Sequence, residues 1–227
     1  WSLLDVVLTA NVQLEHCLVR YAGAGYSTAA QWWSAGSLRH CTFEYSGGSG
    51  INMRLSGTPA IEQCAFDHNA TVAIENAHWH ALPGFRDNTA TGNLQGDYFA
   101  IHGLVQGNVE VWPWNYPNGV LVIDNTWSVP AGASLRLHGG VICKQRAAYG
   151  TDINGRLEML GTSDRPVIVT ALEDDSTIGD TQKNGPPGPG GPIPWYGLVC
   201  HPSPTPPRLL HSIFRHVGWA MYSDYRQ

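Results

Sequence analysis

One ten-residue phrase recurs four times in this chain of 227 residues, and its spacing restricts the possible fold more than any other feature. The copies begin at Leu14, Leu38, Ile61 and Leu209, and the first reads LEHCLVRYAG. The first three copies follow one another at intervals of 24 and 23 residues. A fixed period in the twenties is typical of a solenoid, in which each repeat packs only against its neighbours.

Side chains alternate in character within each copy of the phrase. In the first copy Cys17, Val19 and Tyr21 form one set, and Leu18 and Arg20 form the other. A period of two places successive side chains on opposite faces of a strand. No helical period extends over a useful length. The sequence therefore predicts an all-β fold, a right-handed parallel β-helix with coils of about 23–24 residues.

Stacked coils align equivalent residues in columns, because neighbouring strands lie roughly 4.8 Å apart. The alternation predicts three inward columns: Cys17–Cys41–Cys64, Val19–Phe43–Phe66 and Tyr21–Tyr45–His68. It also predicts that Arg20 lies beside Glu44 on the outside, as a pair that supports the register by about 0.2–1 kcal/mol. The five cysteines are an odd number at repeat-equivalent positions, which favours a column of small buried residues over a disulfide framework.

The fourth copy indicates a second, longer period. His211 follows His16 by 195 residues, so the coils are predicted to be nested in a larger repeat of about 195 residues. Residues 1–96 would be the later coils of one unit, and residues 97–227 the opening coils of the next, continuous with the first. The segment 173–194, rich in glycine and proline, is predicted to be a long surface loop. We expect the natural polypeptide to continue beyond this chain.

Charge and hydropathy exclude two classes of partner. The net charge is −5 and the basic residues are not clustered, so nucleic acid is not expected as the main partner. No apolar run approaches the roughly 18 residues of a membrane-spanning helix.

The second half of the chain carries motifs in a familiar order. The segments are VPAGASL (129–135), GRLEMLGT (155–162), RPVIVT (165–170), DDSTIGDT (174–181) and WYGL (195–198). This order resembles the large secreted bacterial right-handed parallel β-helix proteins of the pectate-lyase-like superfamily, and FRDNTATGN (85–93) is similar to one of their turns. The resemblance implies a secreted or cell-surface bacterial protein, in a superfamily that includes polysaccharide-cleaving enzymes and adhesin-like modules.

The acidic segment 173–181 is the candidate for a metal site. Asp174, Asp175 and Asp180 offer hard oxygen ligands at short spacing, which suits Ca²⁺. The spacing is not that of an EF-hand. The alternative interpretation is that these side chains cap turns within a long loop.

Arg20, Glu44 and Asp67 are the candidates for catalysis, because they face outward on successive coils. An inverting glycosidase requires two carboxylates about 6.5–9.5 Å apart. A polysaccharide lyase requires a base, often Arg or Lys, and Ca²⁺ beside the uronate. Alternating charges that support the register account for the same residues more simply, so the sequence favours a chain without catalytic activity.

Indole rings can stack on sugar rings, and the candidates for glycan contact are Trp32, Trp33, Trp112 and Trp114, although buried tryptophans are the commoner case. His16 and His40 could ligate a metal. Gln63 occupies the same position in the third coil, which favours a hydrogen-bonded ladder there.

These observations predict a non-catalytic extracellular β-helix segment of a larger bacterial surface, adhesive or filament-forming structural protein. Its expected partners are copies of itself or neighbouring repeats of the same chain, because open β-helix ends expose unpaired strand edges. Two alternatives remain: a polysaccharide lyase or hydrolase that acts on acidic glycans, and a glycan-binding module.

Overall fold

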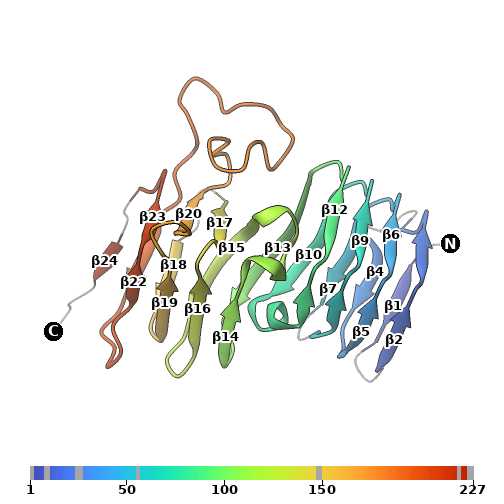
Figure 1. Cartoon of the computed structure of the whole chain (residues 1–227), viewed down its shortest axis with the longest axis horizontal. Coiled ribbons are helices and arrows are strands. Elements are labelled where there is room, and N and C mark those ends of the chain that lie inside the picture. Colours follow the sequence, from blue (N-terminus) through green and yellow to red (C-terminus); the bar gives the residue numbers. More distant parts are fainter. Residues whose placement is uncertain are drawn as a thin grey trace. The chain divides into compact units, whose positions relative to one another are not determined.

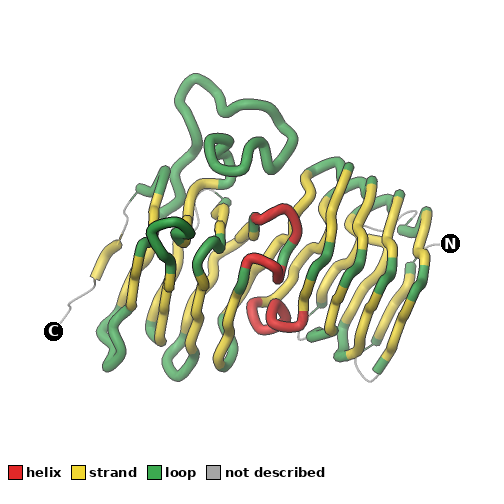
Figure 2. The backbone as a smooth tube through the Cα atoms, in the orientation of Figure 1, coloured by secondary structure: helices red, strands yellow, loops and turns green. Residues whose placement is uncertain are grey.

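The computed structural model describes residues 3–7, 11–23, 28–54, 57–146, 150–218 and the backbone of 221–223. Figure 1 shows short, mostly parallel strands stacked as a β-solenoid. Helix within these residues is confined to three short 3₁₀ segments (Figure 2). The predicted parallel β-helix is confirmed.

The chain divides into two compact units. The first comprises residues 1–100, 114–118 and 181–184, and the second comprises residues 101–113, 119–180 and 185–227. Strand β13 (Gly96–Leu104) carries the chain from the first to the second. The larger repeat of about 195 residues stays a prediction.

The first unit consists of coils that each contribute one strand to three parallel sheets. The sheets run in the orders β1-β4-β7-β10, β2-β5-β8-β11 and β3-β6-β9-β12. The bounds are β1 (Leu4–Val6), β2 (Val12–Glu15), β3 (Leu18–Arg20), β4 (Thr28–Trp32), β5 (Gly36–Arg39), β6 (Thr42–Glu44), β7 (Ser49–Met53), β8 (Ala60–Glu62), β9 (Ala65–Asp67), β10 (Val72–His78), η1 (Trp79–Gly84), β11 (Phe85–Arg86) and β12 (Thr89–Thr91). Leu18 lies opposite Thr42, and Thr42 lies opposite Ala65, so the structure reproduces the predicted period of 24 and 23 residues.

The second unit repeats this arrangement, with sheet orders β14-β16-β19-β22, β15-β17-β20-β23 and β15-β18-β21-β24. Its strands are β14 (Asn108–Val111), β15 (Leu121–Val129), β16 (Ser134–His138), β17 (Ile142–Gln145), β18 (Gly150–Ile153), β19 (Arg156–Leu160), β20 (Val167–Ala171), β21 (Gly197–Cys200), β22 (Arg208–Leu210), β23 (Ser212–Phe214) and β24 (Met221–Ser223). The 3₁₀ segments η2 (Pro113–Asn115) and η3 (Pro117–Gly119) interrupt the strands where proline removes ladder donors. The loop 173–194 contains neither strand nor helix (Figure 2).

Pairs of left-handed residues set the length of the short strands β3, β6, β9, β12 and β23. Each strand lies between two positive-φ residues that are five positions apart: His16 and Tyr21, His40 and Tyr45, Gln63 and His68, Asp87 and Gly92, His211 and His216. Positive φ is uncommon for residues other than glycine, although histidine and aspartate adopt it more readily than most. Two such residues end the strand on both sides and turn the coil through two corners.

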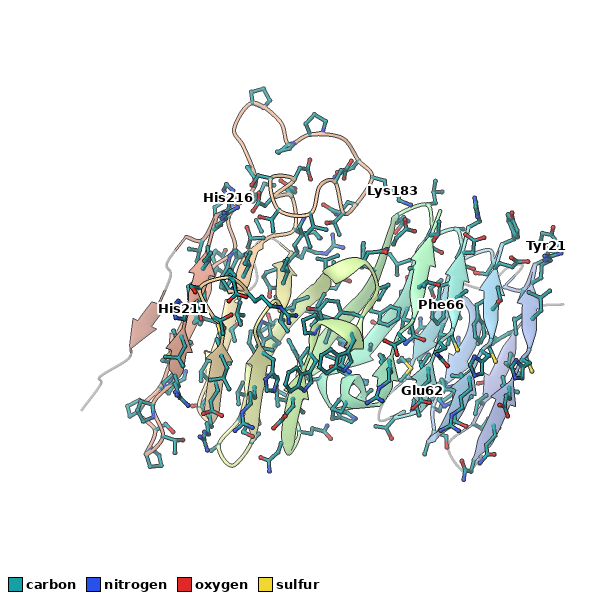
Figure 3. All side chains as sticks on the ribbon, viewed as in Figure 1. Tyr21, Glu62, Phe66, Lys183, His211 and His216 are labelled. Atoms are coloured by element: carbon teal, nitrogen blue, oxygen red, sulfur yellow. The ribbon has the colours of Figure 1, made fainter. Side chains whose placement is uncertain are left out.

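This backbone overturns one of the predicted inward columns. The alternation places Tyr21, Tyr45 and His68 inside, yet Tyr21 and Tyr45 are 65% and 43% exposed, and Figure 3 shows Tyr21 at the outer edge. The prediction was wrong because these residues have left-handed backbone, which ends the period-two alternation one residue before them. Their rings stack outside the coil, with 5.6 Å between the Tyr21 and Tyr45 centroids.

The other two inward columns are confirmed. Val19, Phe43 and Phe66 are buried, and the two phenylalanine rings stack with centroids 5.5 Å apart. Cys41 and Cys64 are buried as free thiols, whereas Cys17 in the first coil is only half-buried. Burial raises the pKa of the Cys64 thiol to about 12, so this side chain packs as a protonated, weakly nucleophilic thiol.

Buried asparagine side chains lie at both corners of the later coils, where they bond the backbone of the preceding coil. The Asn88 Oδ1 accepts from the backbone N–H of Cys64 at 2.9 Å, and its Nδ2 donates to the Ile61 carbonyl at 2.8 Å. Asn69 and Asn93 make the same type of bond at the second corner. Backbone groups that the turns leave unpaired are therefore satisfied by a side chain from the following coil.

Candidate functional site

The predicted catalytic residues lie in one outward row of the first unit. Arg20 on β3 faces Glu44 on β6, and Glu44 faces Asp67 on β9. The Arg20 guanidinium hydrogen-bonds the Glu44 carboxylate. That contact covers Glu44, which is only 8% exposed rather than turned to water as predicted. Asp67 Oδ1 lies 2.8 Å from His68 Nδ1. The row therefore holds two carboxylates on adjacent coils, and each is already engaged by a neighbouring basic side chain.

Two further outward rows have strictly alternating charge, which the sequence reasoning missed. In the first unit the row is Glu15, Arg39, Glu62, Arg86. In the second unit it is Glu110, Arg136, Glu158, Arg208. The signal was available in the first row, because opposite charges recur there at the coil period.

Glu158 shows how firmly such a row is paired. Its side chain is 5% exposed and accepts hydrogen bonds from Arg136 Nε at 2.9 Å and Arg156 Nη2 at 2.8 Å. Burial acts to raise the pKa of Glu158, but these two guanidinium groups outweigh it and lower that pKa. A carboxylate held as an anion between two arginines is suited to holding coils in register, and not to donating a proton.

The acidic segment 173–181 lies beside the side-chain amine of Lys144 in the second unit. The side chain of Lys144 is fully buried, and its Nζ donates to the Gly179 carbonyl at 2.9 Å. Burial lowers the pKa of Lys144, and the charges of Asp175, Asp174 and Asp180 oppose this shift. The three predicted calcium ligands thus share their surroundings with a lysine that the sequence reasoning did not connect to them.

Asp174 is the most constrained of the three carboxylates. It is buried and accepts from the hydroxyls of Thr170 at 2.7 Å and Thr177 at 3.0 Å, and from the backbone N–H of Ser176 at 3.1 Å. Burial acts to raise its pKa, but hydrogen bonds from Ser176, Thr170 and Thr177 outweigh it and hold the pKa of Asp174 at about 2. These contacts are those of a turn-capping aspartate. Calcium binding stays a prediction.

The four candidate tryptophans have different environments. Trp32 is fully buried. Trp33 is partly exposed and donates from Nε1 to Asp5 Oδ1 at 3.0 Å. Trp112 has one face covered by the His138 ring, with 3.4 Å between centroids and 8° between planes. Trp114 is 43% exposed, so it has the most accessible indole of the four.

Trp114 lines a surface recess of about 350 Å³ together with Arg86 and Asp87. The backbone N–H of Asp87 donates to the Trp114 carbonyl at 3.2 Å, which fixes the two segments beside each other. Within the described part of the chain, the Arg86 guanidinium and the Asp87 carboxylate have no hydrogen-bond or ion-pair partner. An accessible indole beside a free cation and a free carboxylate offers both a stacking surface and polar groups to one ligand.

A second cavity, of about 550 Å³, lies in the second unit beside β18 and β21. Its lining includes Trp195, the exposed Tyr196 and Thr151. The Thr151 hydroxyl is buried and has no partner among the described residues.

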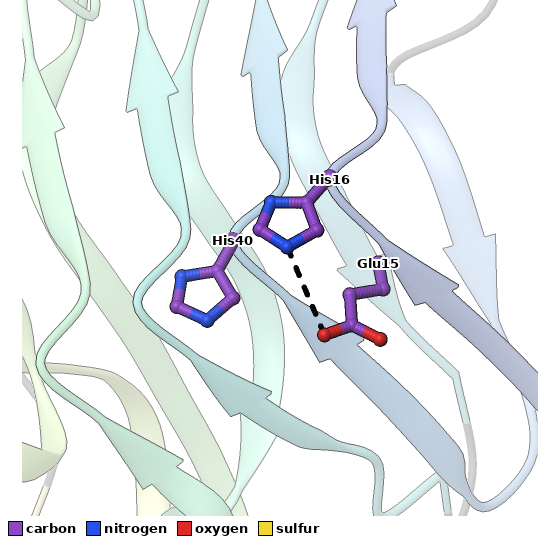
Figure 4. A group of neighbouring side chains, drawn as sticks. All are labelled: Glu15, His16 and His40. Atoms are coloured by element: carbon purple, nitrogen blue, oxygen red, sulfur yellow. Dashed lines mark ion pairs between the residues drawn. The ribbon is translucent and has the colours of Figure 1, made fainter.

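His16 and His40 stack on successive coils, and Glu15 lies beside them (Figure 4). The stack that the sequence suggested is present, but it includes a carboxylate that the sequence reasoning did not consider.

No protein-family model, curated protein or solved structure matches this chain. In the described residues, the structure holds no helix with the length and hydrophobicity required to cross a membrane.

Proposed function

We propose that this chain is a non-catalytic β-helix segment of a larger extracellular structural protein of the bacterial surface. The observation that carries the proposal is that the outward charged residues are engaged with one another between coils. Arg20 bonds Glu44, Arg39 bonds Glu62 at 3.1 Å, and Arg136 bonds Glu158. Side chains that would have to act on a polymer are instead arranged to fix the register of the solenoid.

The resemblance to large secreted β-helix proteins of the pectate-lyase-like superfamily supports an extracellular location. It also supports a place among further repeats of the same kind in a larger protein. A regular parallel solenoid also suits an adhesive or filament-forming role. Its repeats pack on their neighbours, and the unpaired edge strands of an end coil can pair with another copy or repeat. The partners in this proposal are further copies or adjoining repeats of the same kind.

An assay for cleavage of acidic polysaccharides tests this proposal. The chain is incubated with a panel of uronate polymers, with and without Ca²⁺, and chain length and unsaturated ends are followed. We expect no cleavage. Cleavage by the unaltered chain that is lost in Glu44→Gln would contradict the proposal and establish the lyase or hydrolase alternative.

Glycan binding is a second candidate function, favoured by the recess of Trp114, Arg86 and Asp87. A guanidinium pairs well with the carboxylate of a uronic acid, and an indole face packs against the apolar face of a sugar ring. In this proposal Asp87 accepts hydrogen bonds from the sugar hydroxyls. A structural segment that binds an acidic glycan would serve as an adhesive module.

Trp114→Ala is expected to weaken binding of an acidic oligosaccharide at least about tenfold, which corresponds to about 1.4 kcal/mol. Isothermal titration calorimetry measures the affinity. Tyr196→Ala is the matched control, because it removes another exposed aromatic ring elsewhere on the chain. If Tyr196→Ala weakened binding and Trp114→Ala did not, the recess would be the wrong location. An unaltered chain that binds none of the oligosaccharides would contradict the candidate function itself.

A further inference from the structure

Two imidazoles are placed side by side by the geometry of the coil. His16 and His40 occupy the same corner of successive coils, and both have a φ of 52°. Identical backbone conformation at coil spacing gives both side chains the same direction. Their rings stack with 4.8 Å between centroids and 6° between planes. Both rings are exposed, so they can turn without disturbing the core.

A carboxylate completes the cluster. Glu15 is the last residue of β2, and its Oε1 lies 3.8 Å from His16 Nε2. One ligand atom from each of the three side chains lies within 4.8 Å of the other two. Figure 4 shows the three side chains beside one another. Arg39 faces Glu15 in the sheet, but its guanidinium bonds Glu62 instead. Glu15 therefore keeps its carboxylate for the histidines.

We propose that Glu15, His16 and His40 form a surface site for a divalent transition metal such as Zn²⁺ or Ni²⁺. Imidazole nitrogen and carboxylate oxygen are ligands that these ions accept, at about 2.0–2.2 Å for zinc. A bound metal lies in the plane of each imidazole that ligates it, so the two parallel rings must rotate about their Cβ–Cγ bonds. Solvent exposure permits that rotation, and water completes the coordination. This site is independent of the structural role proposed above.

The column itself supplies conservative variants. Gln63 stands at the third position with the same left-handed backbone, at a φ of 53°. Glutamine is thus compatible with this corner, and His16→Gln and His40→Gln should fold as the unaltered chain does. A glutamine amide is a much weaker ligand for these metals than an imidazole. Both variants remove a ligand without changing the turn.

Isothermal titration calorimetry with Zn²⁺ alone, on chelator-stripped protein, tests the site. We expect one saturable site, with affinity lowered at least about tenfold in either His16→Gln or His40→Gln. His211→Gln is the matched control. That residue occupies the same corner in the fourth copy of the phrase, but Gly161 is its neighbour on the preceding coil. Its replacement should leave the affinity unchanged.

Gln63→His provides the opposite test, because it places a third imidazole beside His40. We expect tighter zinc binding, together with changes in the side-chain NMR signals of His16 and His40. The proposal is overturned if the unaltered chain shows no saturable binding, or if His16→Gln and His40→Gln both bind as it does. A third contrary result would be an equal loss of affinity in His211→Gln.

Discussion

Phe66→Ala is expected to lower the free energy of unfolding by about 3–5 kcal/mol. Phe66 is 1% exposed, and its ring stacks on Phe43 and meets the edge of Phe99 at 5.7 Å. Removing the ring leaves a cavity between coils, which cannot close because the neighbouring strands are held at fixed spacing by their hydrogen bonds.

Chemical denaturation followed by circular dichroism measures this loss. Because a solenoid is stabilised by nearest-neighbour contacts, hydrogen exchange should accelerate in β6 and β9 and stay unchanged in β19. Leu94→Ala is the control, since that side chain is 71% exposed and should cost less than about 0.5 kcal/mol. A loss for Phe66→Ala as small as that of the control would show that the ring does not belong to a packed column.

Asn93→Ala is expected to cost about 2–4 kcal/mol, although it removes only a small side chain. The Asn93 amide is fully buried; it donates to the Phe66 carbonyl at 3.0 Å and accepts from the backbone N–H of Asn69 at 3.0 Å. Its removal takes a side-chain partner from each of these two buried backbone groups, and a buried group that is left unpaired costs about 1–3 kcal/mol.

Thermal and chemical unfolding measure the effect of this substitution. Asn125→Ala serves as the control, because Asn125 is exposed and its side-chain oxygen accepts from the adjacent Thr126 N–H. Equal losses in the two variants would mean that the asparagine at the corner does not satisfy the backbone as described.

The fold and most of the core could be predicted because the repeat spacing and the alternation depend only on local sequence. The phrase identified the coil length, the columns of Val19 and Cys17, and the pairing of Arg20 with Glu44. The alternation no longer predicts which face of the coil a side chain lies on at Tyr21, because that residue has left-handed backbone. A tyrosine carries no strong sequence signal for positive φ, so its exposure could not be deduced from the pattern alone.

The candidate sites depend on contacts between residues that are far apart in the sequence, and their order along the chain does not reveal these contacts. Lys144 lies about thirty residues before the aspartates near it. Arg86 and Asp87 lie beside Trp114 because the 3₁₀ segment η2 packs against their coil. Glu15 was overlooked as a ligand because the sequence alone does not show that its carboxylate lies beside both imidazoles. Each of these contacts follows from the register between coils, which had to be known first.

The double readout on Glu44→Gln tests the central claim most directly, namely that the outward charges hold the solenoid and do not catalyse. Free energy of unfolding and cleavage of uronate polymers are measured on the unaltered chain, Glu44→Gln and Asp67→Asn. The structural account predicts a loss of about 1 kcal/mol in Glu44→Gln, because the covered pair with Arg20 is broken, and no cleavage by any of the three proteins. Unchanged stability, combined with cleavage by the unaltered chain that both variants lack, would contradict it.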